Sequence, residues 1–268
     1  AFIAKPFWQI QLTGSHNEQE IIAFHKQDKF WEKSQADKVI ENTKNQKEAK
    51  IDRIEKNQFN QIPPFPFDLT SLQVEAYRCF NISPKETLEI AQELYTSGFI
   101  SYPRTSSQQL PASIGYEKIL NDLSKQKQYQ ELTKRLLKKS KLIPNNGKKT
   151  DPAHPAVFPT GIAPKILKER EAKIYDLIVK RFLSTFAEHA VRETMLMDIN
   201  CNREIFIARG TRTTEKGWHI FYYPYVRLEE IELPNAKQYD KIKIKKIDLL
   251  SKETQAPKRY TPASIIKE

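Results

Sequence analysis

The sequence predicts a mixed α and β protein in which a β-rich domain is interrupted by a mainly α-helical insertion. Three observations support this division. Apolar and polar residues alternate near the N-terminus, two capped helical segments follow residue 64, and alternation returns after residue 191. We assign residues 1–63 and 191–257 to a discontinuous β-rich domain, residues 64–190 to a helical domain, and residues 258–268 to the start of a further domain.

The first strand is predicted within KPFWQIQL, where Trp8, Ile10 and Leu12 fall on one face. Residues 32–56 mix both charge signs with few large apolar side chains, which is typical of a solvated helix or a linker. The stretch NQFNQIPPFPFDLT then places prolines among phenylalanines, and a helix cannot continue there because proline lacks a backbone N–H. We therefore expect a domain boundary near residue 64.

Two helices joined by a short turn are predicted next. Thr70, with Gln73 three residues later, forms the pattern of a capping box at the start of the first helix. Ser83 is the expected cap of the second helix, with a proline at its first position and Glu86 closing a second box. Gly98 is a suitable left-handed stop. The pair resembles a helix-turn-helix.

The helical domain also contains a cationic segment, residues 121–149, with nine lysines and arginines against two acids. Such a patch is the electrostatic footprint expected of a protein that binds nucleic acid. Four of its cations are our candidate DNA contacts: Lys134, Arg135, Lys138 and Lys139.

A long amphipathic helix is predicted after a proline-rich loop, with four apolar residues on one face: Ile174, Leu177, Ile178 and Phe182. From residue 191 the segments TMLMDIN, EIFIARGTRT, GWHIFYYPYV and KIKIKKI have the composition of strands, with FISY a further short buried strand in the helical domain. Gly210 and Gly217 are expected to bracket a hairpin connection.

Composition narrows the function classes. The formal net charge of +11 and pI near 9.4 indicate either a nucleic-acid partner or a lysine-rich composition that reflects biased base content. No apolar run approaches the roughly 18 residues of a membrane span, and no secretory signal pattern is present, so we expect an intracellular protein. Cys79 and Cys201 are expected to be free thiols, and no metal site is expected within this chain.

The segment GFISYPRTSSQQLP contains the strongest candidate for chemistry. Tyr102 and Arg104 flank a proline, and in an extended segment both side chains point to one side. A tyrosine is a weak nucleophile at its ordinary pKa of about 10, so a nearby cation can stabilise its phenolate or bind the phosphate that it attacks. A half-buried structural tyrosine is the alternative.

His154 is the second candidate, within the proline-stiffened loop DPAHPAVFPTG. Its ring can donate to a phosphate oxygen, and Asp151 beside it can raise the pKa of the imidazole. The alternative is a loop histidine that hydrogen-bonds the backbone.

Together, the strings FDLTSLQVEA, ELYTSGFISYPRTSSQQLP, DPAHPAVFPTG and APKRYTPASIIKE resemble type IA DNA topoisomerases, on the side of archaeal topoisomerase I, topoisomerase III and reverse gyrase. The resemblance implies that Tyr102 breaks a DNA strand and retains its 5′ phosphate. It also implies that Arg104 supports the phosphate and the tyrosine, and that His154 and Thr105 contact DNA. Ser106 and Phe158 depart from many bacterial members, which carry an acid and an arginine there.

The resemblance further implies an architecture and partners. The β segments would form the hinged arch of the enzyme, and the tyrosine would lie on a domain related to winged-helix folds. The chain would be a fragment that lacks the magnesium-binding Toprim domain and a C-terminal domain, and the parent would be a cytoplasmic, nucleoid-associated enzyme acting on single-stranded segments of DNA. Within this chain we expect no cofactor.

Two other functions remain open from the residues themselves. One is a non-catalytic DNA-binding module built on the helix-turn-helix, with Tyr102 structural. The other is a tyrosine recombinase or type IB enzyme, which resembles this chain less because His154 follows Tyr102 rather than preceding it.

Overall fold

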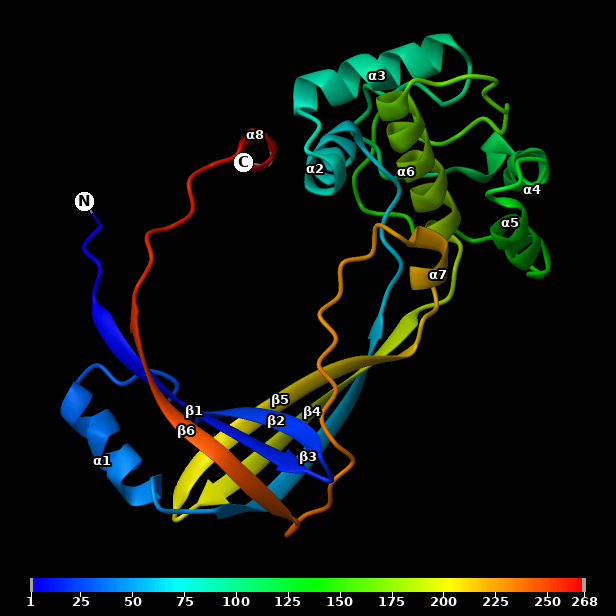
Figure 1. Ribbon diagram of the computed structural model, residues 1–268. Coiled ribbons are helices and arrows are strands. Elements are labelled where there is room, and N and C mark those ends of the chain that lie inside the picture. The colour runs from blue at the N-terminus through cyan, green and yellow to red at the C-terminus, as the bar shows by residue number, and fades with distance from the viewer. Residues whose placement is uncertain (1, 267–268) are drawn as a thin grey trace. The chain divides into compact units, whose positions relative to one another are not determined.

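The computed structural model describes residues 2–266, which form two compact units (Figure 1). Unit 1 comprises residues 2–59, 192–214 and 228–258, and unit 2 comprises residues 60–191, 215–227 and 259–266. Residues 215–227, which the sequence assigns to the β-rich domain, therefore lie in the helical unit. Among the described residues, no helix is both long and apolar enough for a membrane span.

The β-rich part is a closed barrel whose strands follow the order β1, β2, β5, β4, β3, β6 (Figure 1). Their bounds are β1 Pro6–His16, β2 Gln19–His25, β3 Glu48–Gln61, β4 Ala190–Cys201, β5 Glu204–Glu215 and β6 Lys241–Glu253. β1 pairs antiparallel with both β2 and β6. Closure leaves no edge strand exposed for pairing with another chain. The mixed α and β class is confirmed.

Tight turns set the register of two hairpins in unit 1. The turns β1–β2 and β4–β5 each contain two residues of positive φ, namely Asn17, Glu18, Asn202 and Arg203. Such two-residue turns match the right-handed twist of the flanking strands. The prediction that Gly210 and Gly217 bracket a hairpin is wrong, because Gly210 lies inside β5 and Gly217 lies beyond its end.

Helix α1, Lys33–Thr43, contributes to the core of unit 1 together with the inward faces of the strands. Ala36 and Val39 of this helix are buried in the same cluster as Ile10 and Leu12 of β1. The strand β1 has an irregular pairing with β6 between Thr13 and the following glycine. A Cβ on Gly14 would lie 2.7 Å from Cγ2 of Ile242 and 2.9 Å from the Lys243 carbonyl oxygen, so only glycine permits this close approach.

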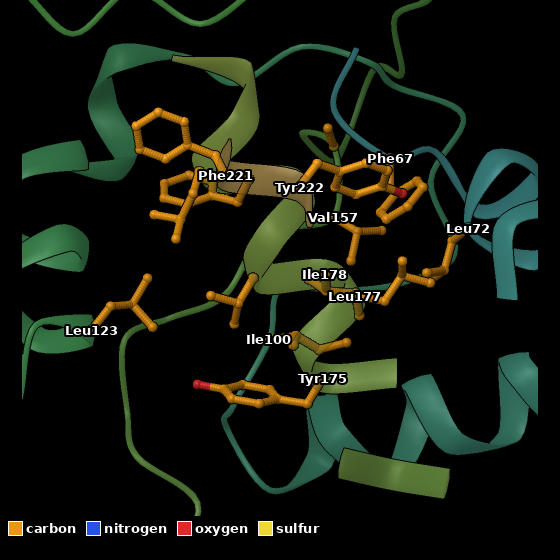
Figure 2. Packing of buried hydrophobic residues seen from close by; sticks show 14 of the residues in the cluster. Phe67, Leu72, Ile100, Leu123, Val157, Tyr175, Leu177, Ile178, Phe221 and Tyr222 are labelled. Atoms are coloured by element: carbon orange, nitrogen blue, oxygen red, sulfur yellow. The ribbon is translucent and has the colours of Figure 1, made fainter. Parts of the chain in front are cut away.

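Unit 2 consists of helices packed around α6. Its elements are α2 Leu69–Phe80, α3 Pro84–Thr96, the short 3₁₀ turn Ala112–Ile114, α4 Tyr116–Leu123, α5 Gln130–Leu137, α6 Glu169–Thr185, α7 His219–Tyr222 and α8 Pro262–Ile265. The apolar face predicted for the long helix is confirmed: Ile174, Leu177, Ile178 and Phe182 are buried. Figure 2 shows Leu177 and Ile178 among side chains from several other segments, including Phe67, Ile100 and Val157.

The helix starts show which capping predictions are correct. α2 begins two residues earlier than expected, because Asp68 rather than Thr70 is the cap and forms a box with Ser71. Ser83 caps α3 as predicted, accepting a hydrogen bond from the Glu86 backbone N–H at 3.2 Å. The Glu86 side chain does not close a box, since it pairs with Arg170.

Two segments have a different structure from the one predicted. Within GWHIFYYPYV, residues 219–222 form helix α7, whose Phe221 and Tyr222 are buried in the core of unit 2. Residues 48–56, expected as part of a solvated helix or linker, belong to strand β3, in which Ala49 and Ile51 are buried while most other side chains are exposed. Neighbouring strands supply the hydrogen bonds that stabilise so polar a strand.

We expect Leu177→Ala to lower the free energy of unfolding of residues 1–268 by about 2–5 kcal/mol, because the fully buried side chain leaves a cavity beside Ile178. Urea unfolding followed by circular dichroism measures the change. Ile166→Ala is the matched control, since Ile166 is 92% exposed. A Leu177→Ala protein within about 0.5 kcal/mol of the parent would contradict the central role of α6.

Candidate active site

The segment that carries Tyr102 is anchored directly after α3. Gly98, at φ +78°, donates its N–H to the Tyr95 carbonyl at 2.8 Å and turns the chain out of the helix, as predicted for a left-handed stop. Ser101 then donates its backbone N–H to the Phe158 carbonyl at 2.8 Å, and Ile100 forms an antiparallel bridge with Pro159. The expected short strand FISY is thus reduced to a single bridge, with Ile100 buried.

On the other side of Tyr102, the chain is held by the loop that carries His154. Thr105 donates its hydroxyl to the His154 carbonyl at 3.2 Å, and its own carbonyl accepts from the Leu69 N–H at 2.9 Å. Gln108 exchanges backbone hydrogen bonds with this loop through Gly147 and Lys149. Tyr102 and Arg104 therefore lie on a short connection between two anchored segments.

The Tyr102 ring contacts two other rings. Its centroid is 4.5 Å from that of His154 at an interplanar angle of 45°, and 5.3 Å from that of Tyr95 at 74°. Within residues 2–266, no hydrogen bond is formed by the Tyr102 hydroxyl. The side chain is only partly buried. The arrangement orients the ring while leaving the phenol oxygen available to a substrate.

Arg104 lies in a tight turn, in which Thr105 donates its N–H to the Pro103 carbonyl at 3.0 Å. The extended geometry expected to aim Arg104 and Tyr102 to the same side is therefore wrong at this residue. The exposed Arg104 lines a groove of about 790 Å³ along α3, together with Glu93 and with Glu171 of α6. None of the ion pairs among the described residues involves the Arg104 guanidinium.

Asp151 organises the loop of His154. Its carboxylate accepts backbone hydrogen bonds from Ala153 at 3.0 Å, His154 at 3.1 Å and Ser106 at 3.2 Å. These bonds, first the one from Ala153, lower the pKa of Asp151 to about 2. The sequence suggested that Asp151 acts on the His154 imidazole, but the carboxylate instead binds the backbone of that residue.

Asp151 also contacts Ser106, which lies in the segment that carries Tyr102. Ser106 donates both its N–H and its hydroxyl to the same Asp151 oxygen, each at 3.2 Å. A carboxylate from the facing loop therefore lies beside Ser106. Ser106 therefore links the segment that carries Tyr102 to the loop that carries His154 through hydrogen bonds.

A second acid that supports this region, the buried Asp68, was not identified from the sequence. It caps α2 through the Ser71 N–H at 2.7 Å, and its other oxygen accepts from Lys149 at 3.2 Å and Gln108 at 3.3 Å. Its side chain is 3% exposed. An aspartate three residues before a serine is itself a capping pattern. Because the cap is predicted at Thr70 instead, the sequence pattern misses Asp68.

The four candidate cations of the basic segment are not equivalent. Lys134 is paired with Glu131 at 3.6 Å, and Lys139 donates to the Phe186 carbonyl at 2.7 Å and to Glu188 at 2.6 Å. Arg135 and Lys138 are exposed. No hydrogen bond or ion pair in the described part of the chain joins any of the four to the tyrosine segment.

Comparison with known proteins identifies the family. A family model described as DNA topoisomerase matches residues 1–268. The chain is 47% identical over 268 residues to a DNA topoisomerase 1 of Methanocaldococcus jannaschii, covering 100% of this chain and 35% of that protein. It is 26% identical to a DNA topoisomerase 3 of Schizosaccharomyces pombe, covering 99% of this chain and 43% of that protein.

A solved structure agrees in fold. Full-length topoisomerase I from Thermotoga maritima superposes with a TM-score of 0.73 at 21% identity, over 99% of this chain and 44% of that one. The chain spans about a third of the length of the Methanocaldococcus jannaschii protein. On the family match and these relatives, the chain belongs to the type IA DNA topoisomerases.

Proposed function

We propose that residues 1–268 carry the nucleophile of a type IA DNA topoisomerase and that Tyr102 is that nucleophile. The observation that supports this most directly is the Tyr102 ring, which contacts the rings of Tyr95 and His154 with its hydroxyl unbonded in the described residues. A purely structural tyrosine gains by bonding its hydroxyl to the protein, as Tyr116 does with the Leu110 carbonyl at 2.5 Å.

The proposed reaction exchanges one phosphate ester for another. The Tyr102 phenol loses its proton, and its oxygen attacks the phosphorus of a single DNA strand. The bond from phosphorus to the 3′ oxygen breaks, and this oxygen takes up a proton as the strand leaves. The 5′ phosphate stays on Tyr102. Because the phosphotyrosine ester is similar in energy to the original diester, attack by the 3′ hydroxyl reseals the strand without a nucleotide cofactor.

Arg104 and His154 support this reaction through charge and hydrogen bonding. The exposed Arg104 guanidinium can bind two phosphate oxygens at once and stabilise the charge that develops on them. The His154 ring contacts that of Tyr102 and can donate to the strand at the same place. Thr105 follows Arg104 in the chain, and its hydroxyl donates to the His154 carbonyl. In our proposal Thr105 therefore affects DNA binding by holding the loop that carries His154.

The two units suit different parts of such an enzyme. We assign the barrel of unit 1 to the hinged arch through which a second strand passes. We assign the pair α2 and α3 of unit 2, joined at Asn81 in the left-handed conformation, to a winged-helix-like core that presents the tyrosine. In our proposal, a Toprim domain and a C-terminal domain outside residues 1–268 complete the enzyme, while residues 259–266 pack with unit 2.

No group of three or more His, Cys, Asp or Glu side chains in residues 2–266 can hold a metal ion. We assign no step of the reaction in these residues to magnesium. We propose that the Toprim domain binds it, and that the whole enzyme acts on single-stranded segments of DNA in the nucleoid.

The nucleophile is tested in a chimera in which residues 1–268 replace the matching segment of the 47% identical Methanocaldococcus jannaschii DNA topoisomerase 1. We expect Tyr102→Phe to abolish the covalent adduct with a labelled single-stranded oligonucleotide, because only the attacking oxygen is removed. Denaturing gel electrophoresis measures the adduct.

Tyr223→Phe is the matched control, since this tyrosine is 70% exposed and lies outside the site. It should form as much adduct as the parent chimera. An adduct that persists in Tyr102→Phe would show that another residue is the nucleophile. A parent chimera that binds DNA but forms no adduct would favour the non-catalytic helix-turn-helix module.

The Asp151 carboxyl should titrate well below the ordinary aspartate value. Its folded pKa is depressed to about 2, so its hydrogen bonds stabilise the loop fully above the unfolded pKa of about 3.9 and are lost as the pH falls through about 2. Carbon-13 NMR of the carboxyl in residues 1–268 checks the midpoint. A midpoint near 4 would mean that the three backbone bonds are absent in solution.

We expect residues 1–268 alone to bind single-stranded DNA weakly and to relax no supercoiled DNA. Arg135→Ala and Lys138→Ala should each weaken binding and make the slope of log K against log salt shallower by about 0.7, the value of one phosphate contact on a single strand. Fluorescence anisotropy at several salt concentrations measures this. Lys125→Ala is the control, because Lys125 is paired with Asp122 at 2.7 Å; an equal effect there would argue against a specific patch.

A further inference from the structure

We propose that Tyr95 is a positioning residue for Tyr102: its ring holds the Tyr102 phenol in the orientation from which the oxygen attacks the phosphate. The inference rests on the proposed function of Tyr102 as nucleophile and adds to it a role for Tyr95, which lies earlier in the same segment ELYTSGFISYPRTSSQQLP.

The backbone around Tyr102 is anchored, but its side chain is not anchored by polar contacts. Ser101 and Thr105 are hydrogen-bonded to the histidine loop on either side. The Tyr102 hydroxyl has no such bond within residues 2–266. The direction of the ring is therefore decided by packing alone, because a half-exposed side chain otherwise exchanges rotamers freely.

Two rings supply that packing, and they differ in origin. His154 lies on a loop at 4.5 Å between centroids and is itself a proposed DNA contact. Tyr95 lies in the last turn of α3 and meets Tyr102 in an edge-to-face arrangement at 5.3 Å and 74°. This geometry is favoured by the charge distribution of aromatic rings.

Tyr95 is itself rigidly supported. Its carbonyl accepts the Gly98 N–H at 2.8 Å, and the preceding Leu94 is buried and accepts from the Phe99 N–H at 2.9 Å. The Tyr95 ring is nevertheless 40% exposed, so it contributes little to the core of unit 2. A helical residue with a fixed backbone and an exposed ring is suited to hold a neighbouring side chain rather than to stabilise the fold.

If Tyr95 positions Tyr102, removing its ring should lower the rate of DNA cleavage without weakening DNA binding. A misdirected nucleophile costs rate because attack requires close approach and alignment, whereas the DNA contacts of Arg104 and the lysines are unaffected. We expect Tyr95→Ala to slow single-turnover cleavage about 3- to 10-fold, the size of one aromatic pair interaction. The dissociation constant for the oligonucleotide should not change.

The experiment uses the same chimera and measures adduct formation at saturating and subsaturating oligonucleotide for Tyr95→Ala, Tyr95→Leu and Tyr95→Phe. Tyr95→Phe retains the ring and should restore the parent rate, while Tyr95→Leu retains much of the volume without the ring and should be as slow as Tyr95→Ala. Circular dichroism melting should place all three within a few degrees of the parent. The shape of the pH profile should be unchanged, since Tyr95 takes no part in proton transfer in the proposed reaction.

Three outcomes would overturn the inference. A parent rate in Tyr95→Ala would show that His154 alone orients the nucleophile. Weakened binding with an unchanged rate at saturation would place Tyr95 against the DNA instead of Tyr102. A slow Tyr95→Phe would assign the effect to the hydroxyl. Tyr102→Phe, measured in parallel, separates this inference from the proposed function: an adduct that persists there overturns both, whereas its loss beside a normal Tyr95→Ala overturns only this one.

Discussion

The candidate site depends on the backbone hydrogen bonding between two irregular segments, residues 98–110 after α3 and residues 146–160 before α6. Neither segment contains a helix or a strand. The buried backbone N–H and C=O groups of one segment therefore form hydrogen bonds with those of the other segment. The bonds of Ser101 to Phe158 and of Gln108 to Lys149 border the connection that carries Tyr102. Because both segments are held, Tyr102 and His154, separated by about 50 residues, are brought into ring contact.

Carboxylates inside this strongly cationic chain stabilise the same arrangement. Asp151 accepts three backbone N–H groups and Asp68 caps α2 while accepting from Lys149. Each acid stabilises the loops through the hydrogen bonds that its carboxylate accepts, and within residues 2–266 neither is hydrogen-bonded to the Tyr102 hydroxyl. The cation that does remain exposed beside the tyrosine is Arg104. The charge distribution thus leaves a positive group for an anionic substrate and uses the negative groups for support.

Much of this could be predicted from local patterns. The caps at Ser83 and Gly98, the apolar face of α6 and the alternation in β1 and β6 are local features, and they are confirmed. The failures share a cause. The strand β3 is polar and depends on its neighbours for hydrogen bonds, and α7 has a β-like aromatic composition that is helical because Phe221 and Tyr222 fill the core of unit 2. The turn at Arg104 likewise arises from the anchoring on both sides of it.

The sequence by itself determined the mixed class, the family and the identity of Tyr102, Arg104 and His154 as candidates, because motif residues and periodicity are readable along the chain. The tertiary structure alone decided which side chains meet. It brought Tyr95 and His154 into contact with Tyr102, directed Asp151 to the backbone of His154 rather than its imidazole, and paired Lys139 with Glu188. The physical reason is that the geometry of these contacts, including those of Tyr102 with His154 and of Lys139 with Glu188 across about 50 residues, follows from how the loops pack and not from any local preference.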